Sequence, residues 1–316
     1  MKLLWLQGAS CSGCSMNFLC AKRPNLIELQ ERYGIQFIFH PSIAPLSGKK
    51  VQELLSVYTQ ESIDILVVEG GVITGPDNTG GYHRYAGKPF MKWVTQLSLH
   101  AKYIIAVGSC SAFGGIPVLS PNVNDTKGLQ FTMRLPGGFL GEPFKSRSGF
   151  PVINIPGCPA HWMNVMTILM DISTGKLMLT DLDEYNRPGY IFKDYLHHGC
   201  PRNEYFEYRQ EATHVGEPGC MFENLGCHGP LVKCNANIHR WFDGWGSCTW
   251  AGFPCIGCVS PGFPEESFPM FQTAKLAGIP VNLPEGVKKS AYFQNKILAD
   301  RACPDRLKIK KGKRHE

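Results

Sequence analysis

The sequence lacks any apolar run of the roughly 18 residues that a membrane-spanning helix needs, so this chain is not expected to span a membrane. It also lacks the layout of a secretory signal, because the apolar stretch in MKLLWLQGAS is too short. We therefore expect a cytoplasmic protein, associated with a membrane only through partners. Charged residues make up only 18% of the 316 residues and apolar residues 43%, which excludes a disordered chain.

The positive charge is unevenly distributed. The formal net charge is +6, and five cations lie among the last nine residues: Lys308, Lys310, Lys311, Lys313 and Arg314. Without this tail the body of the chain is nearly neutral. Composition therefore gives no reason to expect a nucleic-acid partner.

Short apolar, β-rich segments alternate with helix-like segments over the first part of the chain. The expected strands are 3–6, 36–39, 63–68, 103–107 and 152–155. The expected helices are 17–33, 49–61 and 90–100. This alternation predicts βαβ units, and therefore an α/β domain with a parallel sheet covered by helices on both faces.

The regular pattern fades near residue 185. Glycine, proline, cysteine and aromatic residues then dominate, as in GEPGCMFENLGCHGP and GWGSCTWAGFPCIGC. A loop-rich stretch of this size needs cross-links or metal to hold a compact structure. We therefore expect an α/β domain over 1–184, an irregular metal-binding domain over 185–284 and a C-terminal extension with a basic tail over 285–316.

Cysteine is abundant, with thirteen residues, an odd number that favours metal or redox chemistry over disulfides in the cytoplasm. Cys11 and Cys14 follow the first expected strand, Cys110 the fourth and Cys158 the fifth. Parallel sheets bind ligands beyond the carboxyl ends of their strands, so these thiols are expected to converge. Four thiolates suit a zinc ion or a [4Fe–4S] cluster. The alternatives are buried core thiols at Cys110 and Cys158, or a thioredoxin-like pair at Cys11 and Cys14.

Further soft ligands follow in the second half of the chain. They are His197 or His198, Cys200, Cys220, Cys227, Cys234, Cys248, Cys255 and Cys258. Spacing alone does not distinguish structural zinc sites from iron–sulfur clusters that form an electron path. Aromatic residues near the last cysteines favour apolar packing around a cluster, with core or partner contact as the alternative: Trp241, Phe242, Trp245, Trp250 and Phe253. Cys20 and Cys303 are interpreted as non-ligands.

Several motifs occur in a characteristic order: WLQGASCSGCS, AVGSCSAFGGIP, PGCP, HxxC, LGCHGP and FPCIGC. Together they resemble the small subunit of [NiFe] hydrogenases over roughly residues 1 to 275. The resemblance implies a flavodoxin-like N-terminal domain followed by an irregular iron–sulfur domain. It implies a large-subunit partner that carries the Ni–Fe centre, an acceptor that is a protein or quinone, and a dimer or higher oligomer of heterodimers. The implied function is electron relay during H2 oxidation or proton reduction.

The resemblance also implies three clusters and their ligands. These are a proximal [4Fe–4S] cluster on Cys11, Cys14, Cys110 and Cys158, a medial cluster on Cys234, Cys248, Cys255 and Cys258, and a distal [4Fe–4S] cluster on His197, Cys200, Cys220 and Cys227. Many members have proline at the position of Cys248, which leaves a [3Fe–4S] cluster. Here a fourth thiolate predicts a medial [4Fe–4S] cluster, or a [3Fe–4S] cluster if Cys248 is not a ligand.

Other positions depart from the family or leave a choice open. The loop between Cys220 and Cys227 has six residues where the family usually has five, so it is expected to bulge. His198 does not fit the HxxC spacing and is interpreted as a neighbour. Glu69, at the end of VVEG, is either a proton relay or a structural acid that fixes the proximal loop.

Two functional alternatives share part of this evidence. A regulatory, H2-sensing hydrogenase with little turnover would have the same cluster motifs. A zinc-stapled interaction module would have the same ligand types without iron. A relative in the quinone-reducing respiratory complex shares the N-terminal site, but the ligands of the second half argue against it.

Overall fold

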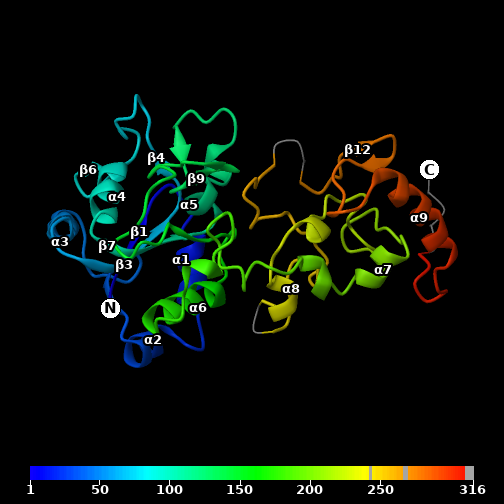
Figure 1. Ribbon diagram of the computed structural model, residues 1–316, viewed down its shortest axis with the longest axis horizontal. Helices are drawn as coiled ribbons and strands as arrows, with labels where there is room; N and C mark the ends of the chain where they lie inside the picture. Colours follow the sequence, from blue (N-terminus) through cyan, green and yellow to red (C-terminus); the bar gives the residue numbers. More distant parts are fainter. Residues whose placement is uncertain (242–243, 266–269, 310–316) are drawn as a thin grey trace. The chain divides into compact units, whose positions relative to one another are not determined.

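The computed structural model describes residues 1–241, 244–265 and 270–309 (Figure 1). The chain divides into two compact units: Met1–Ile191 with Cys258–Pro264, and Phe192–Gly257 with Glu265–Glu316. The domain boundaries expected at 184 and 284 remain predictions. Within the described residues, no helix has both the length and the apolar character needed to cross a bilayer.

A five-stranded parallel sheet forms the centre of the first unit, in the order β11-β7-β3-β1-β2. Its strands are β1 (Lys2–Gln7), β2 (Gln36–Phe39), β3 (Ile63–Glu69), β7 (Ala101–Val107) and β11 (Ile153–Ile155). These are the five strands expected from the apolar segments. The central strands are buried on both faces, which explains why they read as continuous apolar runs. With β1 between β2 and β3, the order is flavodoxin-like, and the expected α/β fold class is confirmed.

Helices cover both faces of the sheet (Figure 1). On one face lie α3 (Lys49–Tyr58) and α4 (Phe90–Ser98), and on the other α1 (Gly13–Leu19), α2 (Leu26–Tyr33) and α6 (Trp162–Ser173) pack together. The inward side chains of α3 recur at helical spacing, and Leu55 is fully buried in the same core as Leu66 of β3. Each such leucine contributes about 1.5–3 kcal/mol relative to an exposed one.

The single helix expected over 17–33 is wrong, because the segment forms two helices. α1 ends at Leu19, and α2 begins after Asn25. The Asn25 side chain accepts the Glu28 N–H at 2.9 Å, while Glu28 accepts the Asn25 N–H at 3.0 Å. This capping box, directly after Pro24, starts a new helix. Cys20, expected inside a helix, lies exposed at the end of α1.

Short elements connect these layers in the first unit. They are β4 (Val72–Ile73) paired with β8 (Thr126–Lys127), β5 (Arg84–Tyr85) with β6 (Lys88–Pro89), β9 (Phe131–Thr132) with β10 (Leu135–Pro136), α5 (Ser109–Phe113), η1 (Ile116–Val118) and η2 (Leu179–Asp181). Among them, α5 matters for the site, because it begins directly beyond the end of β7 and contains Cys110.

The second unit is loop-rich, as the sequence predicts. Its elements are η3 (Leu196–Gly199), α7 (Asn203–Glu207), η4 (Gly229–Leu231), α8 (Ala236–His239), β12 (Lys275–Leu276), β13 (Ile279–Pro280) and α9 (Lys289–Arg301). Among these elements only α9 extends beyond two turns, and it lies in the segment expected only as a C-terminal extension. Cys303, just after α9, is buried.

Candidate metal centres

The carboxyl ends of the central strands lie at one level. Gln7 pairs with Glu69, Glu69 with Val107, and Val107 with Ile155. The loops that follow are joined by backbone hydrogen bonds, such as Gly108 N–H to the Ile155 carbonyl at 2.9 Å. The loops that carry Cys11, Cys14, Cys110 and Cys158 therefore leave the same edge of the sheet.

These cysteines, here called the proximal set, differ in burial. Cys14 is buried and Cys110 half-buried, whereas Cys11 and Cys158 are exposed. Burial, reinforced by the neighbouring Cys158 and Cys11, raises the pKa of Cys110 to about 11. Burial also raises the pKa of Cys14 and of Cys158. Metal ligation requires thiolates, so bound iron would have to supply the positive charge that keeps these groups ionised.

Glycines bring the backbone close to the sulfurs of the proximal set. Gly108 has a φ of +87°, and a Cβ there would lie 2.6 Å from Cys14 Sγ. Gly115 has a φ of +56°, and a Cβ there would lie 3.1 Å from Cys110 Sγ. The Ala160 N–H donates to Cys14 Sγ at 3.4 Å. Close backbone and N–H···S hydrogen bonds are what an iron–sulfur cluster needs around its ligands, so the residues present fit that group.

Glu69 is 1% exposed and accepts hydrogen bonds from two segments, β1 and the start of α1. Its Oε1 accepts the backbone N–H groups of Cys14 and Ser15, at 3.2 and 3.3 Å. Its Oε2 accepts from Trp5 Nε1 at 3.2 Å, from Gln7 Nε2 at 3.4 Å and from the Ser15 hydroxyl. These contacts hold the first turn of α1, and thus Cys14, against β1 and β3. A role as proton relay stays a prediction.

Ser109 is a site residue that the sequence reasoning missed. Its hydroxyl accepts the Gly157 N–H at 3.0 Å and donates to the Cys258 carbonyl. It therefore ties the loop of Cys110 to the loop of Cys158 and to the segment that begins at Cys258. The available signal was its place directly before the cysteine in the GSC motif that follows β7.

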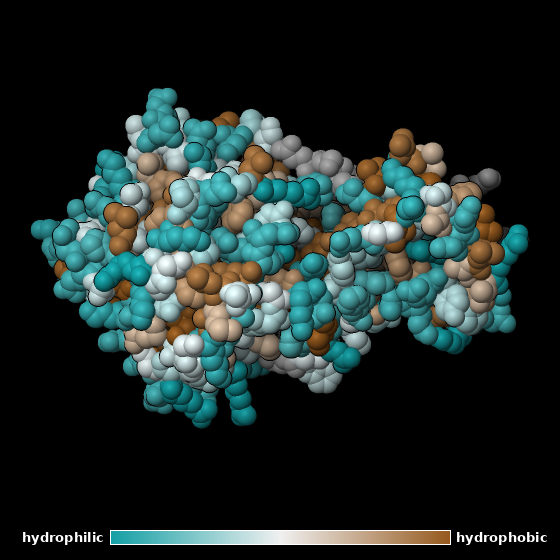
Figure 2. Space-filling view, in the orientation of Figure 1, coloured by the Kyte–Doolittle hydropathy of each residue, from teal (hydrophilic) through white to brown (hydrophobic). Residues whose placement is uncertain are grey.

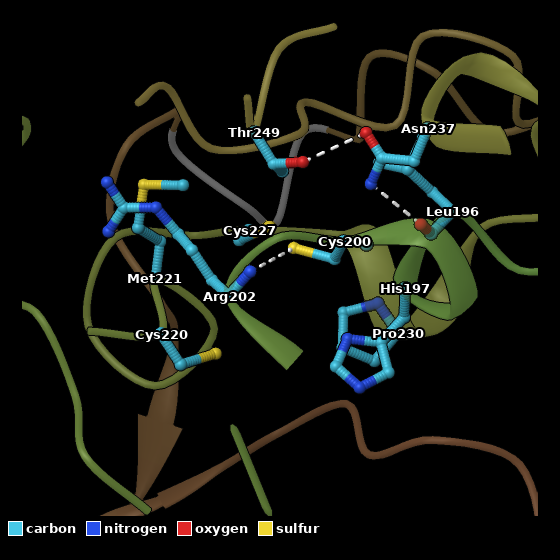
Figure 3. Close-up of a pocket in the computed structure, with 11 residues that line it drawn as sticks. Leu196, His197, Cys200, Arg202, Cys220, Met221, Cys227, Pro230, Asn237 and Thr249 are labelled. Carbon is cyan, nitrogen blue, oxygen red and sulfur yellow. Dashed lines mark hydrogen bonds between the residues drawn. The ribbon is translucent and has the colours of Figure 1, made fainter. Parts of the chain in front are cut away.

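His197, Cys200, Cys220 and Cys227, here called the distal set, line one pocket, which Figure 3 shows with the three sulfurs and the imidazole around a common space. His197 Nε2 is buried and has no hydrogen-bond partner. Burial lowers the pKa of His197 to about 4, so the ring is neutral, which is the form that binds metal. A soft ligand set around a pocket with an orphaned imidazole nitrogen fits a His-ligated iron–sulfur cluster.

Backbone N–H groups point at the sulfurs of the distal set. Arg202 donates to Cys200 Sγ, Phe222 to Cys220 Sγ and Cys255 to Cys227 Sγ, each at 3.4 Å. Burial raises the pKa of Cys220 well above its ordinary value and that of Cys227 to about 11. Cys220 and Cys227 are therefore buried thiols, each with a backbone N–H donor to its sulfur.

The neighbourhood of the distal set settles two details of local structure. The N–H groups of Leu225 and Cys227 both reach the Met221 carbonyl, at 3.1 and 3.3 Å, and this turn accommodates the longer loop between Cys220 and Cys227. His198 does not line the pocket, and its ring packs edge-on against Tyr195 at a centroid distance of 5.7 Å.

The medial set comprises Cys234, Cys248, Cys255 and Cys258. Cys234 and Cys255 are buried, and Cys248 is half-buried with a pKa that burial raises. The Gly257 N–H donates to Cys255 Sγ at 3.4 Å, while Cys258 opens the segment that belongs to the first unit. Across the described part of the chain, no three His, Cys, Asp or Glu side chains converge closely enough for a single metal ion. The three ligand sets are therefore defined by the loops that carry them and, for the distal set, by the pocket that its residues line.

The aromatic residues expected to pack around the medial set do not form a core. Trp245 is 84% exposed, Phe253 53% and Trp250 39%, with Arg240 stacked on the Trp250 ring at 4.3 Å. Trp241 is half-buried, and Phe242 lies outside the described residues. The expectation of apolar packing within this chain is therefore wrong for the three exposed rings, which leaves contact with a partner as their interpretation.

Comparisons with known proteins identify the family of this chain. Residues 11–172 match the family described as NADH ubiquinone oxidoreductase, 20 Kd subunit, and residues 192–271 match the family of the C-terminal region of the NiFe/NiFeSe hydrogenase small subunit. A relative from Methanosarcina mazei, the F420 non-reducing hydrogenase I small subunit, is 33% identical over 301 residues, covering 88% of this chain and 77% of that protein. The chain belongs to the [NiFe] hydrogenase small-subunit family.

Other relatives and solved structures support the assignment of this small subunit. The periplasmic [NiFeSe] hydrogenase small subunit of Desulfomicrobium baculatum is 30% identical, covering 85% of this chain and 86% of that protein. An actinobacterial-type NiFe-hydrogenase from Ralstonia eutropha H16 is similar with a TM-score of 0.76 at 27% identity, covering 100% of this chain and 93% of that one. A [NiFeSe] hydrogenase from Desulfovibrio vulgaris Hildenborough gives 0.74 at 25% identity, covering 86% and 97%.

Membership of this family fixes the general role of the chain. It is the electron-transfer subunit of an oxidoreductase, and it pairs with a large subunit. Iron–sulfur clusters in the small subunit and a Ni–Fe centre in the partner follow from the family. The match of residues 11–172 to a respiratory-complex subunit covers the N-terminal site. The family that matches residues 192–271 is described only for hydrogenases, and this match covers the ligands of the second unit.

Proposed function

We propose that this small subunit relays single electrons between the Ni–Fe site of the large subunit and an external acceptor, a protein or quinone, through three [4Fe–4S] clusters. The proximal, medial and distal sets would hold them. The observation that carries the proposal is the pocket lined by His197, Cys200, Cys220 and Cys227, with a buried, unpartnered imidazole nitrogen and N–H donors to each sulfur. An unpaired buried nitrogen destabilises a fold, and ligation to iron would satisfy it.

Bound clusters would supply one-electron oxidation and reduction. This chain's own residues would set the potentials. Each N–H that donates to a ligand sulfur stabilises the more negative, reduced state and so raises the potential. His197 is neutral where a fourth thiolate would be negative, so it raises the potential of the distal cluster relative to an all-cysteine one. A higher potential at the distal cluster favours electron flow from the Ni–Fe site toward the acceptor, as in H2 oxidation.

Two hydrogen bonds support the order proximal, medial, distal. In the first unit, Ser109, next to Cys110, donates to the carbonyl of Cys258. In the second unit, the Cys255 N–H donates to Cys227 Sγ. Cys255 and Cys258 are the two ends of the CIGC motif, so in each unit one proposed medial ligand adjoins a neighbouring set.

The surface beside the proximal set supports a docked large subunit. Both Cys11 and Cys158 are exposed, and a cluster on them would meet solvent unless a partner covered it. Met16, two residues after Cys14, is 66% exposed, and Ile116, in the turn after the Cys110 helix, is 48% exposed, so the loops of the proximal set carry exposed apolar side chains. We place the large subunit on this face, and a cytoplasmic assembly of two or more heterodimers remains part of the proposal.

Iron and sulfide analysis with EPR on the purified heterodimer tests the cluster assignment. We expect about twelve irons in the small subunit, four for each [4Fe–4S] cluster, and no [3Fe–4S] signal after oxidation. Cys248→Ala should create that signal at full intensity, whereas Cys20→Ala, at an exposed non-ligand, should not. A full [3Fe–4S] signal in the unmodified protein would refute Cys248 as a ligand, and a colourless, iron-free protein would refute the clusters.

A dye-linked assay on the same preparation separates the two hydrogenase roles. Rapid H2-driven reduction of a viologen would support electron relay in turnover. Nearly absent turnover with all clusters in place would instead identify the H2-sensing alternative, which shares every ligand.

A further inference from the structure

The C-terminal segment carries the positive charge of the chain. From residue 270 to the end the sequence has eleven Lys or Arg and four Asp or Glu, whereas the preceding residues have 21 and 22. This segment lies almost entirely beyond residues 192–271, which match the hydrogenase family. Its described cations include several exposed side chains on or beside α9: Lys288, Lys289, Arg301, Arg306 and Lys308.

The inner face of α9 is anchored beside the distal set. Lys296 Nζ contacts both carboxylate oxygens of Glu223, at 2.5 and 2.6 Å, and the Tyr292 hydroxyl donates to Glu223 at 3.2 Å. Glu223 is 4% exposed and belongs to the loop between Cys220 and Cys227. At the other end of α9, Gln210 donates to Asp300 at 2.7 Å. The helix is therefore held against the loop that carries two distal ligands.

A continuous chain of contacting planar groups joins His197 to α9. The His197 ring packs against Phe206 at a centroid distance of 4.4 Å. The Arg209 guanidinium lies 4.5 Å from the Phe206 ring and 4.5 Å from the Tyr292 ring, between the two. Arg209 Nε and Nη1 are buried without a hydrogen-bond partner, so stacking is what holds these atoms. This packed route from the distal histidine thus ends at α9.

The side of α9 next to its anchored face combines cations with exposed apolar side chains, and it lines a groove together with Tyr292 and Lys296. Lys289, Phe293, Ile297 and Arg301 follow at intervals of four, so they form one row along the helix. Phe293 is 55% exposed and Ile297 46%. Figure 2 shows apolar and hydrophilic side chains mixed where Figure 1 labels α9. A helix that lies in a membrane surface would separate its cations from its apolar stripe, whereas here cations close both ends of the apolar pair.

We propose that this exposed row of α9 and the adjoining Lys288 form the docking surface for an acidic, soluble one-electron carrier protein. The apolar pair would be buried at the centre of the contact, and the cations around it would steer the negative partner. Docking there would bring the carrier next to the chain of contacts formed by Tyr292, Arg209, Phe206 and His197. This inference rests on the proposed function, because it takes the distal set to hold the cluster at which electrons leave or enter.

Stopped-flow kinetics on the intact heterodimer test the proposal. The reductants are a plant-type [2Fe–2S] ferredoxin, which is an acidic protein, and the methyl viologen radical, a small cation, each mixed with the oxidised heterodimer. Lys288→Glu with Lys289→Glu reverses two exposed charges at the start of α9. Lys49→Glu with Lys50→Glu is the matched control, since these lysines are exposed at the start of α3. Both pairs place glutamates at a helix N-terminus, where they are tolerated.

At low ionic strength we expect the α9 pair to lower the second-order rate constant with ferredoxin about tenfold. The α3 pair should stay near the unmodified rate, and the rate with viologen should not fall in either variant. The effect of the α9 pair should vanish at high salt, where the Debye length is short.

Equal ferredoxin rates in the two variants would overturn the docking surface, as would a parallel fall in the viologen rate of the α9 pair. Binding to anionic lipid vesicles that the α9 pair abolishes, with the ferredoxin rate unchanged, would overturn it in favour of a membrane surface. If the unmodified heterodimer oxidised neither reductant, the proposed function would fail first and the docking proposal with it.

Discussion

Replacing Glu69 by Gln tests how the loop of Cys14 is held. Glu69 Oε1 accepts the N–H groups of Cys14 and Ser15, while Oε2 accepts from Trp5, Gln7 and the Ser15 hydroxyl. Glutamine has one oxygen, so its amide NH2 must face one of these two groups of donors. Facing the backbone, it would leave two buried N–H groups unpaired. Facing the other group, it would strand only the Trp5 indole, because the Ser15 hydroxyl and the Gln7 amide can turn and accept.

The second arrangement is the less costly, and it sets the expected magnitude. One unpaired buried donor destabilises by about 1–3 kcal/mol, and the remaining hydrogen bonds lose the strength that a charged acceptor gives them. We therefore expect Glu69→Gln to lower the free energy of unfolding by about 2–4 kcal/mol, the range of a disrupted buried network. Because the same network fixes the first turn of α1, the proximal cluster should be partly lost.

Pulse proteolysis in urea follows the small-subunit band of the heterodimer, and iron analysis with EPR follows the proximal cluster. Glu53→Gln, at an exposed acid on α3, serves as control and should change stability by no more than about 0.5 kcal/mol. If Glu69→Gln retained the urea midpoint and all iron while hydrogen isotope exchange at nickel slowed, the carboxylate would move protons rather than hold the loop, and the reasoning would be refuted.

Two further predictions concern the first unit. Gly108→Ala puts a Cβ 2.6 Å from Cys14 Sγ, so the proximal EPR signal should disappear. The control is Gly175→Ala, which is also at positive φ but has no atom within 4 Å and should retain the signal. A full signal in both variants would contradict the close approach. Burial lowers the pKa of His40 to about 4, so the folded protein disfavours protonation of this ring. The contribution of neutral His40 to the free energy of unfolding is therefore full above pH 6.5, and up to about 3 kcal/mol is lost as the pH drops toward 4. His40→Asn, whose oxygen can accept the Ser42 N–H, should flatten that arm of the urea midpoint against pH; an unchanged slope would argue against it.

The proximal edge could be predicted from sequence because it depends on topology alone. Parallel strands end at one edge, so a cysteine just after each of β1, β7 and β11 must reach that edge. The observed register, in which Glu69 pairs with Val107, is the one that the positions of the apolar segments already imply. The donors around Glu69 were a different matter, since they come from β1 and from the start of α1, and no spacing rule identifies their common acceptor.

The distal set could not be derived from spacing. Its loops have few regular hydrogen bonds, and only the family motifs predicted that Cys200, Cys220 and Cys227 belong together. The break between α1 and α2 is a different kind of miss, because its signal was present. Pro24, Asn25 and Glu28 form a helix-start pattern that the apolar periodicity over 17–33 obscured.

The helix α9 shows why the structure of the C-terminal segment could not be predicted from the sequence. It buries Tyr292 alone among its residues, so it has no apolar face for a periodicity to reveal. It is anchored instead through polar contacts, chiefly with Glu223, which is buried and pairs with Lys296. Removing that lysine would leave a buried charge in the loop between Cys220 and Cys227. The packing of α9 and the structure of the distal loop are therefore coupled through Glu223, and the proposed carrier surface lies on the helix that this loop anchors.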